Sequence, residues 1–406
     1  MEKDLSSTPA WELDKFVEDH IIADTRFLNK VKADIDYICT FLKEKHLKGV
    51  TRSVKLNELM NYKSLMKEIH FKDVKISKVL MSGCFDSESD LKDTTEVNIT
   101  IFLKGLQIFE EVFWRWEEFL EEIKKELCKL PGEEKFQLHY EVQNPEECYP
   151  SFLSFKLSSS ELQQEVECRV WLARDVLPDV LPDVLHKLRN NPVLGPEICN
   201  DTYSELIHEC TTPESEGNYS LSFVELQNNF LEDRPPKLKK LICLVKYWHQ
   251  LCMEKLGKPV PPRYALELLT VYAWEHGSGV ADFSIAQGFR TVLKLITKYE
   301  YLIIYWTVYY DFQHGEVSDY LRRQLQKDRP IILDPADPTR NIAGCTIMGW
   351  YFLADLAEEW LDYPCFKNRD GSQVRSWKVL TEVPGTKQQV TRNFFSRSYF
   401  SFPVSP

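Results

Sequence analysis

Two hydrophobic periodicities divide this chain, and they occupy different parts of it. Apolar residues that alternate with polar ones, as in strands, occur mainly between residues 75 and 171. After Asp175 the apolar residues recur every three or four positions, as in amphipathic helices. A doubly wound sheet would need strands and helices to alternate throughout. The segregation therefore predicts an α+β protein with two lobes, a sheet-containing N-lobe and a helical C-lobe.

The same patterns predict individual elements. Strands are expected at Lys75–Ser82, Glu96–Leu103, Gln137–Val142, Ser151–Leu157 and Val166–Trp171, with helices near 28–47 and 110–130. In the C-terminal half, helices are expected at 238–252, 264–274, 286–296 and 348–361. From Ser376 onward the sequence is polar and unpatterned, which predicts a loosely ordered tail. The expected domains are therefore an N-lobe at 1–185, a C-lobe at 186–375 and a tail at 376–406.

Composition limits the class of protein. The 406 residues are 43% hydrophobic and 28% charged, which suits a globular protein with a substantial core. A net charge of −12 argues against a chain that coats nucleic acid everywhere, although a local basic face remains compatible with it. The sequence has no apolar run that could span a bilayer, and its N-terminus does not read as a signal peptide. The 11 cysteines lack zinc-ligand spacing, so free thiols and a cytoplasmic location are expected.

One predicted strand carries the most informative polar residues. In the stretch from Thr95 to Phe102, Val97 and its alternate neighbours face one way, while Glu96 and Asn98 face the other. Two acidic residues at positions i and i+2 are how polymerase-type nucleotidyltransferases hold two magnesium ions against a triphosphate. Here the second position is an amide, so one of the two negative charges is missing.

Several longer motifs are distinctive. They are Leu13–Phe16, Arg234–Lys239, Leu244–Trp248, Tyr264–Glu275, Ala286–Val292, Ile332–Thr339 and Pro364–Asn368. Together they resemble the 2′-5′-oligoadenylate synthetase family over roughly residues 5–380. The resemblance implies a polymerase-beta-like nucleotidyltransferase fold, with double-stranded RNA lying across both lobes. It also implies that an active member would join ATP molecules through 2′-5′ linkages, and that the product would activate a latent ribonuclease in interferon-linked antiviral defence.

The match to the family places Glu96, Asn98 and Arg169 at its three catalytic acid positions. An amide offers a neutral oxygen, and a guanidinium brings a positive charge to the place where a divalent cation should bind. A second register would instead use Asp175, in the motif Arg174–Pro178, as the third carboxylate. That register still leaves Asn98 unexplained.

The nucleotide-binding positions implied by the resemblance are only partly kept. In the phosphate loop at Ser82–Ser89, Gly83 is kept, but the lysine position is Ser87 and acidic residues surround it. In the C-lobe, Lys246 and Tyr264 are kept, whereas Cys243 replaces an arginine and Arg263 a glutamine. The resemblance therefore predicts a catalytically inactive paralogue, in which Mg²⁺ and ATP would be cofactors only if activity were retained.

The resemblance also implies an RNA-binding face. The basic residues available for it are Lys43, Lys45, Lys48, Lys78, Arg234, Lys237 and Lys240. Asn228 and Glu232 stand where the family has basic residues, and Pro236 replaces a threonine, so weakened binding of double-stranded RNA is expected. Cys365, Phe366 and Lys367 resemble a family motif linked to self-association.

Three functions are compatible with these features. The first is an inactive paralogue that binds double-stranded RNA, or pairs with active synthetases, and so modulates the oligoadenylate pathway. The second is a weakly active synthetase that uses Glu96 and Asp175. The third is an interaction protein that no longer binds RNA.

Overall fold

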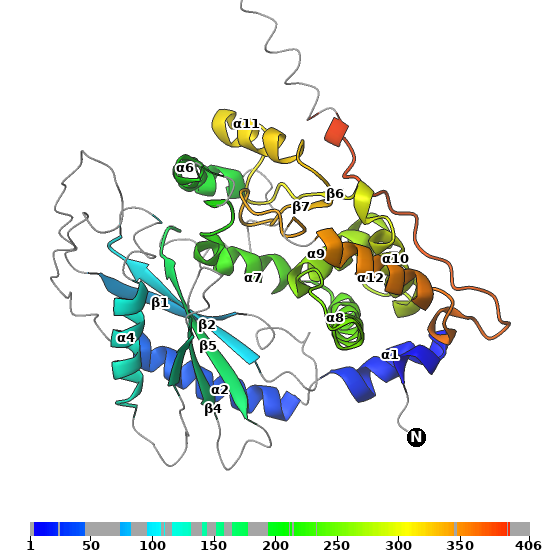
Figure 1. Cartoon of the computed structure of the whole chain (residues 1–406), viewed down its shortest axis with the longest axis horizontal. Coiled ribbons are helices and arrows are strands. Elements are labelled where there is room, and N and C mark those ends of the chain that lie inside the picture. Colours follow the sequence, from blue (N-terminus) through cyan, green and yellow to red (C-terminus); the bar gives the residue numbers. More distant parts are fainter. Residues whose placement is uncertain are drawn as a thin grey trace, which may run out of the picture. The chain divides into compact units, whose positions relative to one another are not determined.

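The structure is a computed structural model, and it divides the chain into two compact units (Figure 1). The sheet unit comprises Arg26–Gly83 and Thr95–Val176; the helical unit comprises Met1–Thr25, Cys84–Thr94 and Leu177–Pro406. The described residues are 4–22, 25–44, 74–82, 96–106, 109, 116–130, 140–143, 152–157, 165–177, 194–210, 212, 215–232, 234–344, 347–387 and 389. The predicted α+β class with sheet and helical lobes is confirmed. The boundaries differ from the expected ones, because the first 25 residues belong to the helical unit and the division falls at Val176.

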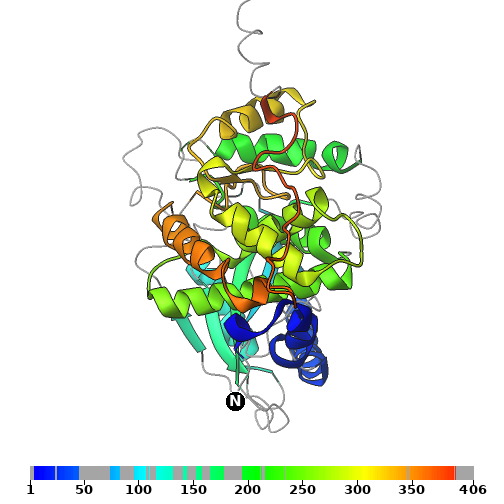
Figure 2. The same cartoon turned by 90° about the vertical axis from the view of Figure 1, so that its right-hand side faces the viewer.

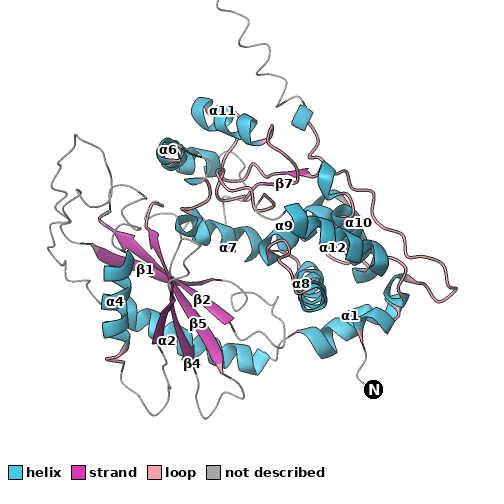
Figure 3. Cartoon of the chain, viewed as in Figure 1, coloured by secondary structure: helices cyan, strands magenta, loops and turns pink. Residues whose placement is uncertain are grey.

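The sheet unit is built on five strands in the order β1-β2-β5-β4-β3 (Figure 3). They are β1 (Lys75–Ser82), β2 (Glu96–Lys104), β3 (Tyr140–Gln143), β4 (Phe152–Leu157) and β5 (Val166–Arg174). The pair β2–β5 is parallel, and every other pair is antiparallel. The parallel pair at the centre of the sheet holds the strand that carries Glu96 beside the strand that carries Arg169.

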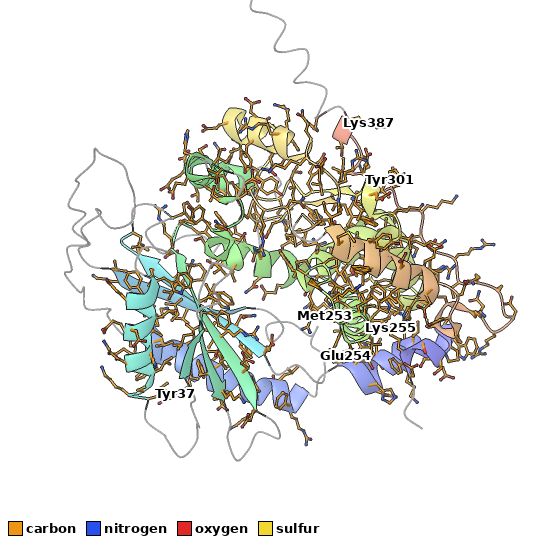
Figure 4. All side chains as sticks on the ribbon, viewed as in Figure 1. Tyr37, Met253, Glu254, Lys255, Tyr301 and Lys387 are labelled. Carbon is orange, nitrogen blue, oxygen red and sulfur yellow. The ribbon has the colours of Figure 1, made fainter. Side chains whose placement is uncertain are left out.

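One face of this sheet is the hydrophobic core of the unit. Val97, Ile99 and Ile101 of β2 are at most 1% exposed. Helices α2 (Thr25–Lys43) and α4 (Trp116–Leu127) have apolar stripes with helical spacing that are also buried. Burial, and secondarily the nearby thiol of Cys39 on α2, raise the pKa of Cys168 on β5, which places α2 over this face. The opposite side of α2 is solvent-facing, as its exposed Tyr37 shows (Figure 4).

The helical unit is built of packed helices of different lengths (Figure 2). They are α1 (Leu13–Phe16), α6 (Leu194–Glu209), α7 (Val224–Glu232), α8 (Pro236–Leu256), α9 (Arg263–His276), α10 (Ile285–Ile296), α11 (Gly315–Gln324) and α12 (Ile347–Trp360), with a small parallel ladder of β6 (Ile303–Ile304) and β7 (Ile331–Ile332). The centre of α8 packs Trp248 against Phe289 of α10 and Trp360 of α12. None of the helices in the described ranges is long and apolar enough to cross a membrane.

The prediction of a loosely ordered tail from residue 376 is wrong for the first part of that segment. The backbone N–H of Trp377 donates to Thr291 Oγ1 at 2.9 Å, and its ring meets Phe283 edge-to-face at 5.4 Å. Further along, the backbone N–H of Val383 donates to Ile303 O at 3.0 Å, so the segment extends the edge of β6. The segment is described as far as Lys387 (Figure 4) and again at Gln389. Its contacts come from single aromatic and backbone groups, which leave no periodic pattern in the sequence.

Candidate catalytic face and basic residues

The polar face of the sheet brings together the three positions that the sequence matched to catalytic acids. Glu96 lies opposite Glu167, and Asn98 lies opposite Arg169, in the parallel β2–β5 register. Residues in register on parallel strands project from the same face of a sheet. Glu96, Asn98 and Arg169 therefore share one small area at the start of both strands.

Arg169 is held by two carboxylates in this area. Its Nη1 and Nη2 donate to Glu96 Oε2 and Oε1 at 3.1 and 2.9 Å, and its Nε donates to Glu167 Oε1 at 3.0 Å. The guanidinium also lies 5.4 Å from the centre of the Phe152 ring. A bidentate pair between a guanidinium and a carboxylate uses both oxygens of that carboxylate. Both oxygens of Glu96 are thus directed at an internal cation.

Asn98 is also engaged within the face. Trp171 Nε1 donates to Asn98 Oδ1 at 2.9 Å. The Trp171 indole lies against the Phe152 ring, with 4.6 Å between the ring centres. The amide oxygen of Asn98, the one atom of its side chain that could bind a metal, therefore already accepts a hydrogen bond from a half-buried indole.

These residues do not fit a two-metal site. Such a site needs several carboxylates that converge on the ions. Here the only carboxylate among the three matched positions is Glu96, and a guanidinium stands where a divalent cation would approach it. Across the described part of the chain, no group of three or more His, Cys, Asp or Glu residues is placed to hold a metal.

Asp175 does not rescue the third acid position. It follows the end of β5, six residues beyond Arg169, which corresponds to roughly 20 Å along a strand. Its carboxylate Oδ1 lies 3.3 Å from Lys78 Nζ, and its side chain is only 6% exposed. Asp175 is therefore paired with Lys78, at the opposite end of the strand from Glu96.

The kept residues of the C-terminal nucleotide positions lie in buried polar surroundings in the helical unit. Lys246 Nζ of α8 is 3.2 Å from Glu267 Oε1 of α9, and the Lys246 side chain is 4% exposed. The Tyr264 hydroxyl donates to Asp334 Oδ1 at 3.5 Å. Asp334 also accepts from Gln227 Nε2 and from the backbone N–H of Ala336, at 2.7 and 2.9 Å. Complete burial raises the pKa of Asp334 to about 7.

The two replaced nucleotide positions of the C-lobe differ in burial. Cys243 is fully buried within α8, whereas Arg263 at the start of α9 is half-buried. The phosphate loop, including Gly83 and Ser87, lies outside the described residues.

The lysines of the N-lobe that were predicted to bind RNA differ in exposure and in ion pairing. Lys43 is exposed in the last turn of α2, and Lys45 and Lys48 lie outside the described residues. Lys78 is paired with Asp175 and lies 4.9 Å from the centre of the Phe102 ring. Sequence reasoning gave no warning of this pair, because it joins residues about a hundred positions apart.

In the helical unit, acidic partners hold all three of the predicted RNA contacts. Arg234 Nη1 is 2.5 Å from Glu275 Oε1, and its side chain is 10% exposed. Lys237 Nζ is 3.2 Å from Asp14 Oδ1 and 2.8 Å from Asp282 Oδ1. Lys240 Nζ is 2.5 Å from Glu18 Oε1. Arg234 is thus part of the packed interior, whereas Lys237 and Lys240 form surface pairs with partly exposed acids.

The motif linked to self-association is mostly inaccessible. Cys365 and Phe366 are completely buried, and Phe366 packs against Phe289 of α10 at 5.1 Å. Within the motif, only Lys367 presents its side chain to solvent. The first two residues therefore stabilise the helical unit and offer no surface to a partner.

Sequence reasoning missed Glu167, Trp171 and Phe152, which complete the polar face of the sheet. A signal for two of them was present, because Glu167 and Trp171 stand two positions either side of Arg169 and so share its face of the strand. Phe152 could not be placed without the pairing of β4 with β5.

Comparison with known proteins identifies relatives for nearly the whole chain. A family profile described as 2′-5′-oligoadenylate synthetase 1, domain 2, C-terminus matches residues 197–382. The 2′-5′-oligoadenylate synthase 1A of Rattus norvegicus is 48% identical over 379 residues, covering 93% of this chain and 97% of the relative. The inactive 2′-5′ oligoadenylate synthetase 1C of Mus musculus is 47% identical over 383 residues, covering 94% and 98%. Relatives named as inactive are thus about as similar as one that is not, so overall identity does not decide activity.

Solved structures agree on the fold. The CdnC protein of Escherichia coli MS115-1, in a complex with HORMA-deltaN, has a TM-score of 0.52 at 12% identity, covering 88% of this chain and 90% of that one. The structure of the same protein with ATP has a TM-score of 0.51, covering 87% and 90%. The fold is that of a nucleotidyltransferase, and the chain belongs to the 2′-5′-oligoadenylate synthase family.

Proposed function

We propose that this chain is a catalytically inactive member of its family that acts by binding double-stranded RNA. The observation that carries the inactivity is the bidentate pair between Arg169 and Glu96, made within the face where metal ligands are required. Because the guanidinium already neutralises Glu96, a divalent ion would have to displace Arg169 and then bind beside its positive charge.

The energetic consequence follows from the ligands that are lost. Of the three matched positions, Asn98 and Arg169 supply no negative charge, and Arg169 adds a positive charge. This difference should remove several kcal/mol of metal binding, and each ~1.4 kcal/mol lost from transition-state stabilisation lowers the rate tenfold. A weakly active synthetase that uses Asp175 is not favoured, since that residue pairs with Lys78 at the other end of β5.

The test of inactivity is direct. Purified protein is incubated with poly(I:C), ATP and Mg²⁺, and the products are separated by chromatography beside those of a synthetase that is active under the same conditions. We expect no 2′-5′ oligomers from this chain. Formation of such oligomers, at a rate proportional to its concentration, would contradict the proposal.

The RNA-binding part of the proposal is supported by exposed cations. Lys43 is exposed at the end of α2, and Lys237 and Lys240 have side chains that are 27% and 32% exposed. Exposed ion pairs contribute only about 0–1 kcal/mol, so backbone phosphates can replace Asp14 and Glu18 as partners at low cost. A protein that holds RNA without making oligoadenylate would lower the RNA available to active synthetases and so damp the antiviral oligoadenylate pathway.

A titration of a labelled RNA duplex at two salt concentrations tests this part. We expect binding that weakens as salt rises, because phosphate contacts release counterions. In a mixture with an active synthetase and limiting duplex, the chain should reduce oligoadenylate synthesis in proportion to the duplex it binds. Absence of salt-dependent binding would instead favour an interaction protein that no longer binds RNA.

A further inference from the structure

A second group of basic residues lies in the helical unit, on segments other than the start of α8 that carries the predicted RNA contacts. It consists of Lys294 and Lys298 at the end of α10 and Arg375 and Lys378 on the segment that crosses that helix. Figure 2 shows this segment, in orange-red, running across the helices of the unit. The four residues are called the α10 cation group below.

The two parts of the group are fixed to each other. Lys294 Nζ donates to Ser376 Oγ at 3.0 Å, and the backbone N–H of Trp377 donates to Thr291 Oγ1 one turn earlier. The Trp377 ring fills space beside Gly277 and Gly288, where an added Cβ would come within 2.7 and 2.9 Å of it. Arg375 and Lys378 flank this anchored dipeptide, so their backbone positions are set by α10.

The α10 cation group is short of negative charge. Lys298, Arg375 and Lys378 are exposed, and none of them has an ion-pair partner within the part of the chain that the structure describes. Glu300 accepts from the Tyr299 hydroxyl and Asp362 from Gln373 Nε2 at 3.3 Å, and neither carboxylate forms an ion pair with a member of the group among the described residues. Burial, together with Arg290 and Lys298, lowers the pKa of Lys294, as expected among like charges.

This arrangement differs from that of Lys237 and Lys240, whose charges are matched by Asp14, Asp282 and Glu18. A group of cations without acidic partners on a fixed backbone attracts a polyanion, and a nucleic-acid backbone is a chain of phosphates. We infer that the α10 cation group is a second contact surface for the phosphate backbone of RNA. The inference rests on the proposed binding of RNA, and it assigns part of that binding to residues outside the motifs shared with the family.

The test compares two variants with the same change in net charge. Lys298→Glu with Lys378→Glu alters the group, whereas Lys125→Glu with Lys129→Glu alters exposed lysines that each pair at 2.6 Å with a glutamate three residues earlier, on α4 or just beyond its end. Binding of a labelled RNA duplex to the full chain is measured over a range of salt concentrations. The first variant should bind roughly tenfold more weakly or worse, with a salt slope lower by about 2, and the control should change less than about threefold.

Each outcome separates the inference from the proposal on which it rests. If the wild type binds the duplex and both variants match it, the α10 cation group is not a contact surface, although RNA binding stands. If the wild type does not bind the duplex, RNA binding itself fails and the inference fails with it. A milder variant, Lys298→Gln with Lys378→Gln, should give a smaller loss in the same direction, while circular dichroism confirms that each protein is folded.

Discussion

The Arg169–Glu96 pair on the polar face of the sheet and the Lys246–Glu267 pair of the helical unit differ in how far their side chains are exposed to solvent. On the sheet, Glu96 and Arg169 have side chains that are 47% and 29% exposed. In the helical unit, Lys246 and Glu267 have side chains that are only 4% and 15% exposed. Water can solvate the carboxylates of the sheet pair when their partner is lost, so breaking that pair should cost little stability, whereas breaking the buried pair should cost much more.

The largest change in the free energy of unfolding is expected when Lys246 is replaced. Replacing it by methionine would leave Glu267 without its cation in a site where both side chains are mostly buried. We expect the free energy of unfolding to fall by about 3–5 kcal/mol, measured by urea denaturation with tryptophan fluorescence. The double change Lys246→Met with Glu267→Leu should recover most of the loss. An undiminished loss in the double variant would show that the pair is not the source of the stability.

A second effect is the pH dependence that Asp334 introduces. Its pKa is raised to about 7 in the folded state, so between pH ~4 and about 7 the folded chain binds a proton that the unfolded chain has released. The contribution of this group to stability is therefore greatest at low pH and is lost as the pH rises to about 7. From pH 5 to about 7, the unfolding free energy of the wild type should fall relative to that of Asp334→Asn, because only the wild type has this slope. Parallel curves would contradict the assignment.

A smaller loss in the free energy of unfolding is expected when the ion pair on the sheet is broken. Arg169→Met removes the partner of both Glu96 and Glu167, but water can solvate these half-exposed carboxylates. We expect a loss of only about 1 kcal/mol in the same denaturation experiment. A loss as large as that of Lys246→Met would remove the contrast between the two regions.

The smallest effect is expected at Trp171. Changing it to phenylalanine removes the hydrogen bond to Asn98 while keeping an aromatic ring against Phe152. The free energy of unfolding should fall by about 0.5–1 kcal/mol. A matched change of the exposed Trp11 to phenylalanine should have less effect, and equal losses would indicate that the hydrogen bond contributes nothing.

Sequence reasoning placed the central parts of this molecule well. Alternation of apolar residues located β2, because it depends on local order along a single strand. The resemblance to the family pointed to Arg169, which the structure has opposite Asn98 on the neighbouring strand. Sequence reasoning did not find the pairing of Lys237 with Asp14, nor the contact of Trp171 with Asn98, because such contacts join segments distant in the chain. The prediction for segment 376–387 was wrong for a related reason. Its attachment depends on the space that Gly277 and Gly288 leave for the Trp377 ring, and that space forms only when the chain has folded.

The central claim is that Arg169 occupies the place of the metal ions. The most direct measurement is binding of Mn²⁺ in the presence of a nonhydrolysable ATP analogue, by crystal soaking with anomalous scattering, for the wild type and for Asn98→Asp with Arg169→Asp. The wild type should show no Mn²⁺ beside Glu96, and the double variant should show at least one ion there. A pair of Mn²⁺ ions bound beside Glu96 in the wild type would contradict the account.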